Sequence, residues 1–93
     1  MTTRGVHVTN ALGLHARAAA RFVRLAASFA AHVKVAHGGR VIDGKSIMGL
    51  LLLAAARGTE ITISADGIDE DAAVEALCGL IARGFDEEGA CPS

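Results

Sequence analysis

The chain has 93 residues, of which 52% are hydrophobic and 3% aromatic, and its formal net charge is −1. This length allows one small domain and no second core. The longest apolar run, residues 47–56, is half the ~20 residues that a membrane-spanning helix needs, and the N-terminus lacks the apolar stretch of a signal peptide. We therefore expect no membrane insertion.

Charge is divided unevenly along the chain. Residues 1–57 hold eight of the nine Lys and Arg and one acid, whereas residues 58–93 hold one Arg and nine acids. A basic half suits an acidic protein surface or a phosphate. The chain has no Trp or Tyr to stack on bases, so we expect no nucleic-acid partner. Cys78 and Cys91 show no spacing pattern, which is typical of reduced thiols in the cytoplasm.

The first half of the chain predicts three elements. Residues 4–10 alternate between apolar and polar side chains, which indicates a strand that Gly13 ends. Residues 16–29 carry apolar side chains at three- and four-residue spacing, the pattern of an amphipathic helix. Residues 31–43 alternate again around two glycines and predict a β-hairpin with its turn at 37–40.

The second half predicts a helix, a strand and a helix. Ser46 is a predicted N-cap for a short helix over 47–56, closed by Gly58. Residues 60–65 alternate clearly and predict a strand. Residues 69–85 predict the last helix, because acids occupy its first turn and an apolar stripe follows.

The predicted element order is βαββαβα. Strands that are apolar on one face need cover on that face only. We therefore predict an α+β open-faced sandwich, in which a four-stranded, mostly antiparallel sheet carries three helices on one face. Residues 1–85 form this single domain, and residues 86–93, acidic and then small with one proline, are expected to be a disordered tail.

His15 stands directly before the predicted helix over 16–29. The first N–H groups of a helix have no partner within it, and its dipole is positive there. This end disfavours the imidazolium form. An anion attached to the ring would fall on the amides of Ala16, Arg17 and Ala18, and the Arg17 guanidinium has the forked geometry that suits phosphate.

Three arginines follow His15 at helical spacing. Arg17, Arg21 and Arg24 lie at i, i+4 and i+7, within about 60° of arc. Such a basic ridge would steer an acidic protein surface toward His15. The residues alone leave an alternative equally open, in which His15 only caps the helix and the arginines form a solvated face.

The segment GLHARAAARF, with GKSIMGLLLLAA and GTEITISADG downstream, resembles the histidine-containing phosphocarrier protein HPr of the bacterial phosphotransferase system. The resemblance covers about residues 4–85. It implies that His15 accepts a phosphoryl group on a ring nitrogen from enzyme I and passes it to an enzyme IIA domain, in sugar uptake or in nitrogen or carbon regulation. The protein would be a stoichiometric carrier rather than an enzyme, without a cofactor, and we expect a cytoplasmic monomer.

Ala18 departs from the family pattern, which usually has proline at that position. Proline in the first turn only presets φ and removes an N–H that has no helical partner, so we expect the function to survive. With Ala18 and the segment SIMGLLLLAA, the sequence resembles the nitrogen-related branch of the family more than the sugar-transporting type.

The resemblance also implies roles for the short helix. The serine that matches Ser46 is phosphorylated by HPr kinase/phosphorylase in some lineages, and Ile47, Met48 and Leu51 would form a docking patch close to His15. A phosphate at a helix N-terminus is tolerated locally but would repel an acidic partner. The alternatives are that Ser46 is only a cap, and that the apolar residues belong to the core or to an oligomer contact.

Two other classes of function are compatible with parts of the sequence. Residues 39–46 match G-x-x-x-x-G-K-S, the pattern of a nucleotide-binding P-loop, but their β-branched interior predicts a strand. The protein could also be an interaction module regulated at Ser46 in which His15 does no chemistry. A metal site is not expected, because His32 and His37 are five apart and point to opposite faces of a strand.

Overall fold

The computed structural model describes residues 1–86 and has the predicted order βαββαβα. The strands are β1 (Thr2–His7), β2 (His32–His37), β3 (Arg40–Asp43) and β4 (Glu60–Asp66). The helices are α1 (Ala16–Ala27), α2 (Ile47–Leu53) and α3 (Glu70–Ala82), followed by the 3-10 turn η1 (Gly84–Asp86). The predicted tail over 86–93 lies, except for Asp86, outside the described residues.

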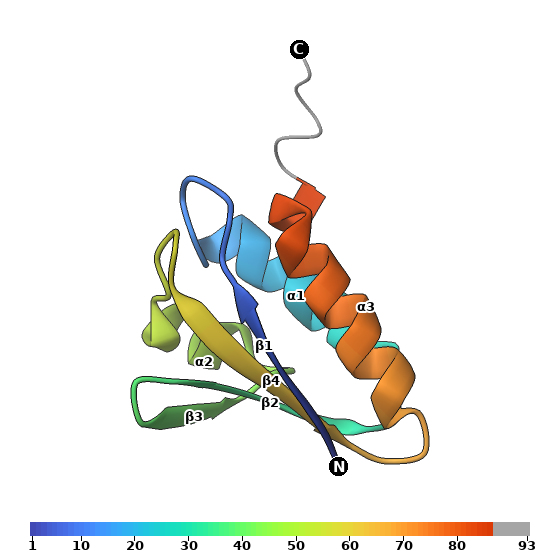
Figure 1. Ribbon diagram of the computed structural model, residues 1–93. Coiled ribbons are helices and arrows are strands. Elements are labelled where there is room, and N and C mark those ends of the chain that lie inside the picture. Colours follow the sequence, from blue (N-terminus) through green and yellow to red (C-terminus); the bar gives the residue numbers. More distant parts are fainter. Residues whose placement is uncertain (87–93) are drawn as a thin grey trace.

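The four strands form one sheet in the order β1-β4-β2-β3. All three pairings are antiparallel, so β4, the last strand in sequence, lies between β1 and β2. Within it, Ile61 is opposite Val6 of β1, and Ile63 is opposite Val35 of β2. The helices lie on one side of this sheet (Figure 1). The predicted open-faced sandwich is therefore confirmed.

The core lies between the helices and the covered face of the sheet. Alternation places Ile61, Ile63 and Ala65 of β4 in the core, all buried, as predicted. Phe22 of α1 and Phe85 of η1 are the largest fully buried side chains. Aliphatic residues fill the remaining space, because the chain has only three Phe and no Trp or Tyr. Burying their apolar surface is the main term that stabilises the sandwich.

The boundaries of the first two elements differ from the prediction. β1 ends at His7 rather than at residue 10, because Val8 bonds instead to the turn before β4, through Thr59 O at 2.9 Å. α1 ends at Ala27 rather than at residue 29, because Ser28 closes it. The Ser28 hydroxyl donates to the carbonyl of Leu25 at 2.6 Å, which replaces the next helical bond.

The last two helices are also shorter than predicted. α2 ends at Leu53 instead of residue 56, and Ala54 in the left-handed region closes it in place of Gly58. The reason is tertiary: the carbonyl of Ala55 accepts the N–H of Leu14 at 3.0 Å, so it is used outside the helix. α3 covers 70–82 instead of 69–85, because Gly84, with φ of 70°, turns the chain back toward the core.

None of the helices in residues 1–86 combines the length and the apolar character that crossing a bilayer requires.

Candidate functional site

His15 is the N-cap residue of α1, the position predicted from the sequence. Its backbone is extended, with φ of −81° and ψ of 178°, and its carbonyl accepts the first helical bond from Ala19 N–H at 2.8 Å. Its ring Nδ1 accepts the N–H of Arg17 at 3.3 Å. The residue is half-buried, so the imidazole is held by the helix and still reaches the surface.

The loop before His15 is held by two elements. The buried Asn10 side chain donates to the carbonyl of Gly13 at 2.8 Å, and Leu14 is bonded to Ala55 after α2. Gly13 has φ of 66°, and a β-carbon there would lie 2.5 Å from the carbonyl oxygen of Ala55. Only glycine allows this close approach. The end of α2 therefore helps to position His15, through a contact between distant residues that no local pattern predicts.

The first turn of α1 supplies the predicted anion-binding groups. The N–H groups of Ala16, Arg17 and Ala18 precede the first helical bond, so they have no partner within the helical ladder. No acidic residue occupies this turn. Ala18, which stands where the resembling family has proline, is fully buried, whereas the Arg17 side chain is exposed. The turn therefore combines a positive helix end with one accessible guanidinium.

The arginine ridge is uneven in exposure. Arg17 and Arg24 are exposed, but Arg21 is half-buried. Its Nη1 donates to the carbonyl of Phe85 at 2.5 Å, across the interface between α1 and the end of α3. Their helical spacing alone predicts three equivalent arginines. In the structure Arg21 joins two elements, and Arg17 and Arg24 are the accessible members.

Ser46 caps α2, as predicted. Its hydroxyl accepts the N–H of Gly49 at 3.0 Å, which satisfies one of the amides at the start of the helix. The adjacent Ile47 and Met48 are 41% and 66% exposed, so two large apolar side chains lie beside one another at the surface. The predicted cap and two members of the predicted patch thus lie together.

Leu51, the third predicted member of the patch, is only half-exposed and packs partly against the core. Leu52 takes the outward position and is 62% exposed. Leu12, in the loop before His15, is 73% exposed and was also missed. These differences in exposure could not be predicted for a helix in which almost every residue is apolar, because no polar stripe marks its outer face.

The P-loop alternative does not agree with the backbone. Residues 40–43 form β3 and pair with β2, with Val35 opposite Ile42. A segment engaged in a sheet does not wrap around a phosphate as the glycine-rich loop of a nucleotide-binding site does. Within residues 1–86, no group of three His, Cys, Asp or Glu side chains is placed to hold a metal ion.

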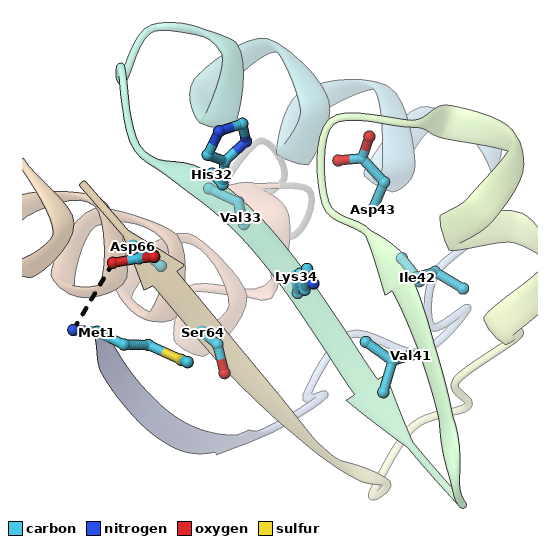
Figure 2. A pocket seen from close by; sticks show the side chains of 10 residues that line it. Met1, His32, Val33, Lys34, Val41, Ile42, Asp43, Ser64 and Asp66 are labelled. Carbon is cyan, nitrogen blue, oxygen red and sulfur yellow. Dashed lines mark ion pairs between the residues drawn. The ribbon is translucent and has the colours of Figure 1, made fainter.

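A cavity of about 480 Å³ lies on the face of the sheet opposite the helices (Figure 2). Its lining carries charges of both signs: Lys34 is paired in register with Asp43, and the ammonium group of Met1 is 3.9 Å from the Asp66 carboxylate. None of the predicted site residues lines it. The candidate site is therefore the surface at the N-terminus of α1, not this cavity.

Known proteins share both the sequence and the fold. The family model described as "PTS HPr component phosphorylation site" matches residues 2–83. Phosphocarrier protein HPr of Cupriavidus necator is 47% identical over 87 residues, 94% of this chain and 98% of that protein. Phosphocarrier protein NPr of Shewanella violacea is 42% identical over 84 residues, 90% and 92% of the two chains. The crystal structure of HPr-C-His from Thermoanaerobacter tengcongensis has a TM-score of 0.88 and 38% identity, covering 91% and 96%.

The family match and the shared open-faced sandwich fold place the chain among the phosphocarrier proteins. The chain belongs to the HPr family of the phosphotransferase system.

Proposed function

We propose that this protein is a carrier in which His15 accepts a phosphoryl group from enzyme I and passes it to an enzyme IIA-type acceptor in the cytoplasm. The observation that carries the proposal is the position of Nδ1 at the N-cap of α1, 3.3 Å from the N–H of Arg17. The role is stoichiometric, because each cycle returns the protein to its starting state. No metal or cofactor takes part.

Nδ1 is the ring nitrogen that suits this transfer. A ring nitrogen that accepts an N–H carries no proton, and its lone pair can attack once that N–H is released. In-line attack forms a bond between Nδ1 and phosphorus as the bond between phosphorus and the donor breaks, and the donor atom keeps that electron pair. Onward transfer to the acceptor reverses these steps. A group on Nδ1 lies against the helix, whereas one on Nε2 would lie farther from it.

The transferred phosphoryl group would be held by the start of α1. Its oxygens can accept the N–H of Arg17, which Nδ1 gives up on phosphorylation, and those of Ala16 and Ala18. The exposed Arg17 guanidinium offers charge-assisted bonds in addition. These groups are present before the reaction, so the site needs little rearrangement to receive the anion.

Partner docking would use the surface around His15. The basic ridge of Arg17, Arg21 and Arg24 would attract an acidic partner. The outer side of α2 would provide apolar contact through exposed Ile47, Met48 and Leu52 and half-exposed Leu51. We also propose that the carrier acts as a monomer, which sedimentation at micromolar concentration tests.

The proposal is tested by mass spectrometry after incubation with phosphoenolpyruvate and enzyme I. The native chain should gain one phosphoryl group that is labile in acid and stable in alkali. His15→Ala should gain none while keeping its circular dichroism spectrum. The matched control is His32→Ala, which changes an exposed histidine on β2 and should be phosphorylated fully. A full yield of phosphoprotein from His15→Ala would refute the site. Transfer of the phosphoryl group from the phosphorylated protein to purified IIA domains of the sugar and nitrogen branches identifies the pathway.

A second proposal concerns regulation at Ser46. The hydroxyl is beside the apolar patch and on the docking surface, so an HPr kinase/phosphorylase that modifies it would place a dianion there. Ser46→Asp should slow acceptance from enzyme I by about tenfold at low salt, because it repels an acidic partner. Ser64→Asp adds the same charge on the uncovered face of the sheet and should leave the rate unchanged. Equal rates for Ser46→Asp and the native chain would contradict the electrostatic argument.

A further inference from the structure

The loop between β1 and α1 contains a fully buried polar side chain. Asn10 is 1% exposed, and within residues 1–86 it is the only polar side chain in the buried class. Asparagine is usually exposed in proteins, and burying a polar group costs free energy that its hydrogen bonds must offset. An apolar residue would serve better at this position if packing alone mattered. The Asn10 amide is therefore expected to have a further role.

The Asn10 side chain and the backbone of His15 share one acceptor. Asn10 Nδ2 donates to the carbonyl of Gly13 at 2.8 Å, and the N–H of His15 donates to the same oxygen at 2.9 Å. A carbonyl oxygen has two lone pairs, so it can accept both bonds. The Gly13 carbonyl thus connects a buried side chain directly to the residue that carries the imidazole.

These bonds belong to two consecutive turns. The N–H of Gly13 donates to the carbonyl of Asn10 at 3.2 Å and closes a four-residue turn over 10–13. The bond from His15 to Gly13 closes a three-residue turn over 13–15. The first turn is closed by the backbone without the Asn10 amide. The side chain acts on the second turn, because it fixes the carbonyl on which that turn depends.

The chain around Asn10 is itself fixed from two sides. The Thr9 hydroxyl donates to the carbonyl of Ile81 in α3 at 3.2 Å, and Val8 makes two backbone bonds to the turn before β4, at 2.9 and 2.7 Å. Gly84 packs over the side chain, since a β-carbon there would lie 3.6 Å from the Asn10 β-carbon. Asn10 can therefore serve as a fixed point for the loop that leads to α1.

We propose that Asn10 is a positioning residue for the phosphoryl-accepting nitrogen, an inference that rests on the proposed function of His15. The bond to Gly13 fixes the N–H side of His15, and the bond from Ala19 fixes its carbonyl side. Together they hold the extended backbone, with φ of −81° and ψ of 178°, from which Nδ1 reaches the N–H of Arg17 at 3.3 Å. Asn10 acts through Gly13 and touches neither the ring nor the phosphoryl group.

This role predicts a specific kinetic effect. In-line transfer requires Nδ1 to approach phosphorus in one geometry, and a misplacement of about 1 Å can slow such a reaction by about 100-fold. Asn10 is buried, so it is not part of the surface on which partners dock. Loss of its amide should lower kcat for acceptance from enzyme I and leave KM unchanged. A purely structural role predicts lower stability without this division.

The test uses the full chain as the varied substrate of enzyme I. Asn10→Leu keeps the branched shape of the side chain without a donor, and Asn10→Ala removes the donor without adding apolar bulk. Both should lower kcat by about tenfold or more, with KM within about twofold of the native value. The matched control is Val74→Ala, which removes buried apolar volume in α3 and should keep the native kcat. Circular dichroism establishes that each variant is folded at the assay temperature.

A second measurement needs no enzyme I. In 15N NMR spectra of the unphosphorylated chain, the signals of the Arg17 amide and of His15 Nδ1 should move in both Asn10 variants and keep their positions in Val74→Ala. Native kcat in the Asn10 variants, an equal loss of kcat in Val74→Ala, or unmoved Arg17 and His15 signals would each overturn the proposal. If enzyme I fails to phosphorylate the native chain, the phosphocarrier proposal fails, and the NMR comparison still decides whether Asn10 positions the ring.

Discussion

Ala54 and Phe85 are the two residues other than glycine in 1–86 with positive φ, at 51° and 59°. The left-handed conformation costs an L-residue roughly 1–2 kcal/mol. Ala54 adopts it where α2 ends, one residue before the carbonyl that holds Leu14. The surrounding contacts therefore impose backbone strain beside the loop that positions His15.

This strain can be relieved by one substitution. Ala54→Gly should raise the free energy of unfolding by about 0.5–1 kcal/mol, because glycine adopts positive φ without steric cost and loses only part of that gain through its greater freedom in the unfolded chain. Urea denaturation measures the change. The control is Ala72→Gly, at an exposed position in α3, which should lower the same quantity by about 1 kcal/mol. Destabilisation of both variants would show that Ala54 is unstrained.

At the scale of elements, α1 and α3 are joined at their C-terminal ends. Phe85 follows α3, its ring is fully buried, and its carbonyl accepts from Arg21 of α1. Gly84, also with positive φ, turns the chain so that the ring enters the core. The same two residues thus close α3, complete the core and orient the Arg21 side chain.

Phe85→Ala should lower the free energy of unfolding by about 3–5 kcal/mol, since it leaves a cavity in a packed core. Phe85→Leu keeps most of the apolar volume and should cost less than about 1.5 kcal/mol. Denaturation curves of the two variants give both values. A loss below about 1 kcal/mol for Phe85→Ala would mean that the ring contributes little packing.

At the scale of the molecule, two neighbouring carboxylates tie the start of α3 to distant parts of the chain. Glu70 bonds the Met1 ammonium group at 2.9 Å, and Asp69 accepts the N–H groups of Ala30 and Ala31 after α1, at 2.8 and 2.9 Å. The Met1 ammonium, with the N–H of Gly67, lowers the pKa of Glu70 to about 2. The N–H of Ala30, followed by that of Ala31, lowers the pKa of Asp69.

These shifts predict how stability depends on pH. A carboxylate whose pKa is lower in the folded state stabilises the fold above its unfolded pKa, and the contribution is lost as the pH falls through the folded value. For Glu70 this loss lies between pH 4.5 and about 2. Glu70→Gln should therefore reduce the fall in Tm across this window. Glu75→Gln, on the exposed face of α3, is the control. An unchanged slope in Glu70→Gln would contradict the prediction.

The predictability of the candidate site follows from how far apart its parts are in sequence. His15 as the N-cap of α1 and Ser46 as the N-cap of α2 could be identified because a cap bonds an amide two or three residues later. The contact of Leu14 with Ala55 could not be identified from the sequence, since forty-one positions separate the two residues. The spacing N-x-x-G at 10–13 was the one available signal that the loop was structured.

The sequence by itself determined the order of the elements, the face that each strand buries and the residue at the start of α1, because periodicity and capping act among residues within about four positions. Only the tertiary structure decided that β4 is central, that α2 ends at Leu53, and that Arg21 contacts Phe85. These features depend on which distant surfaces pack together, and packing is a property of the whole core that no local pattern encodes.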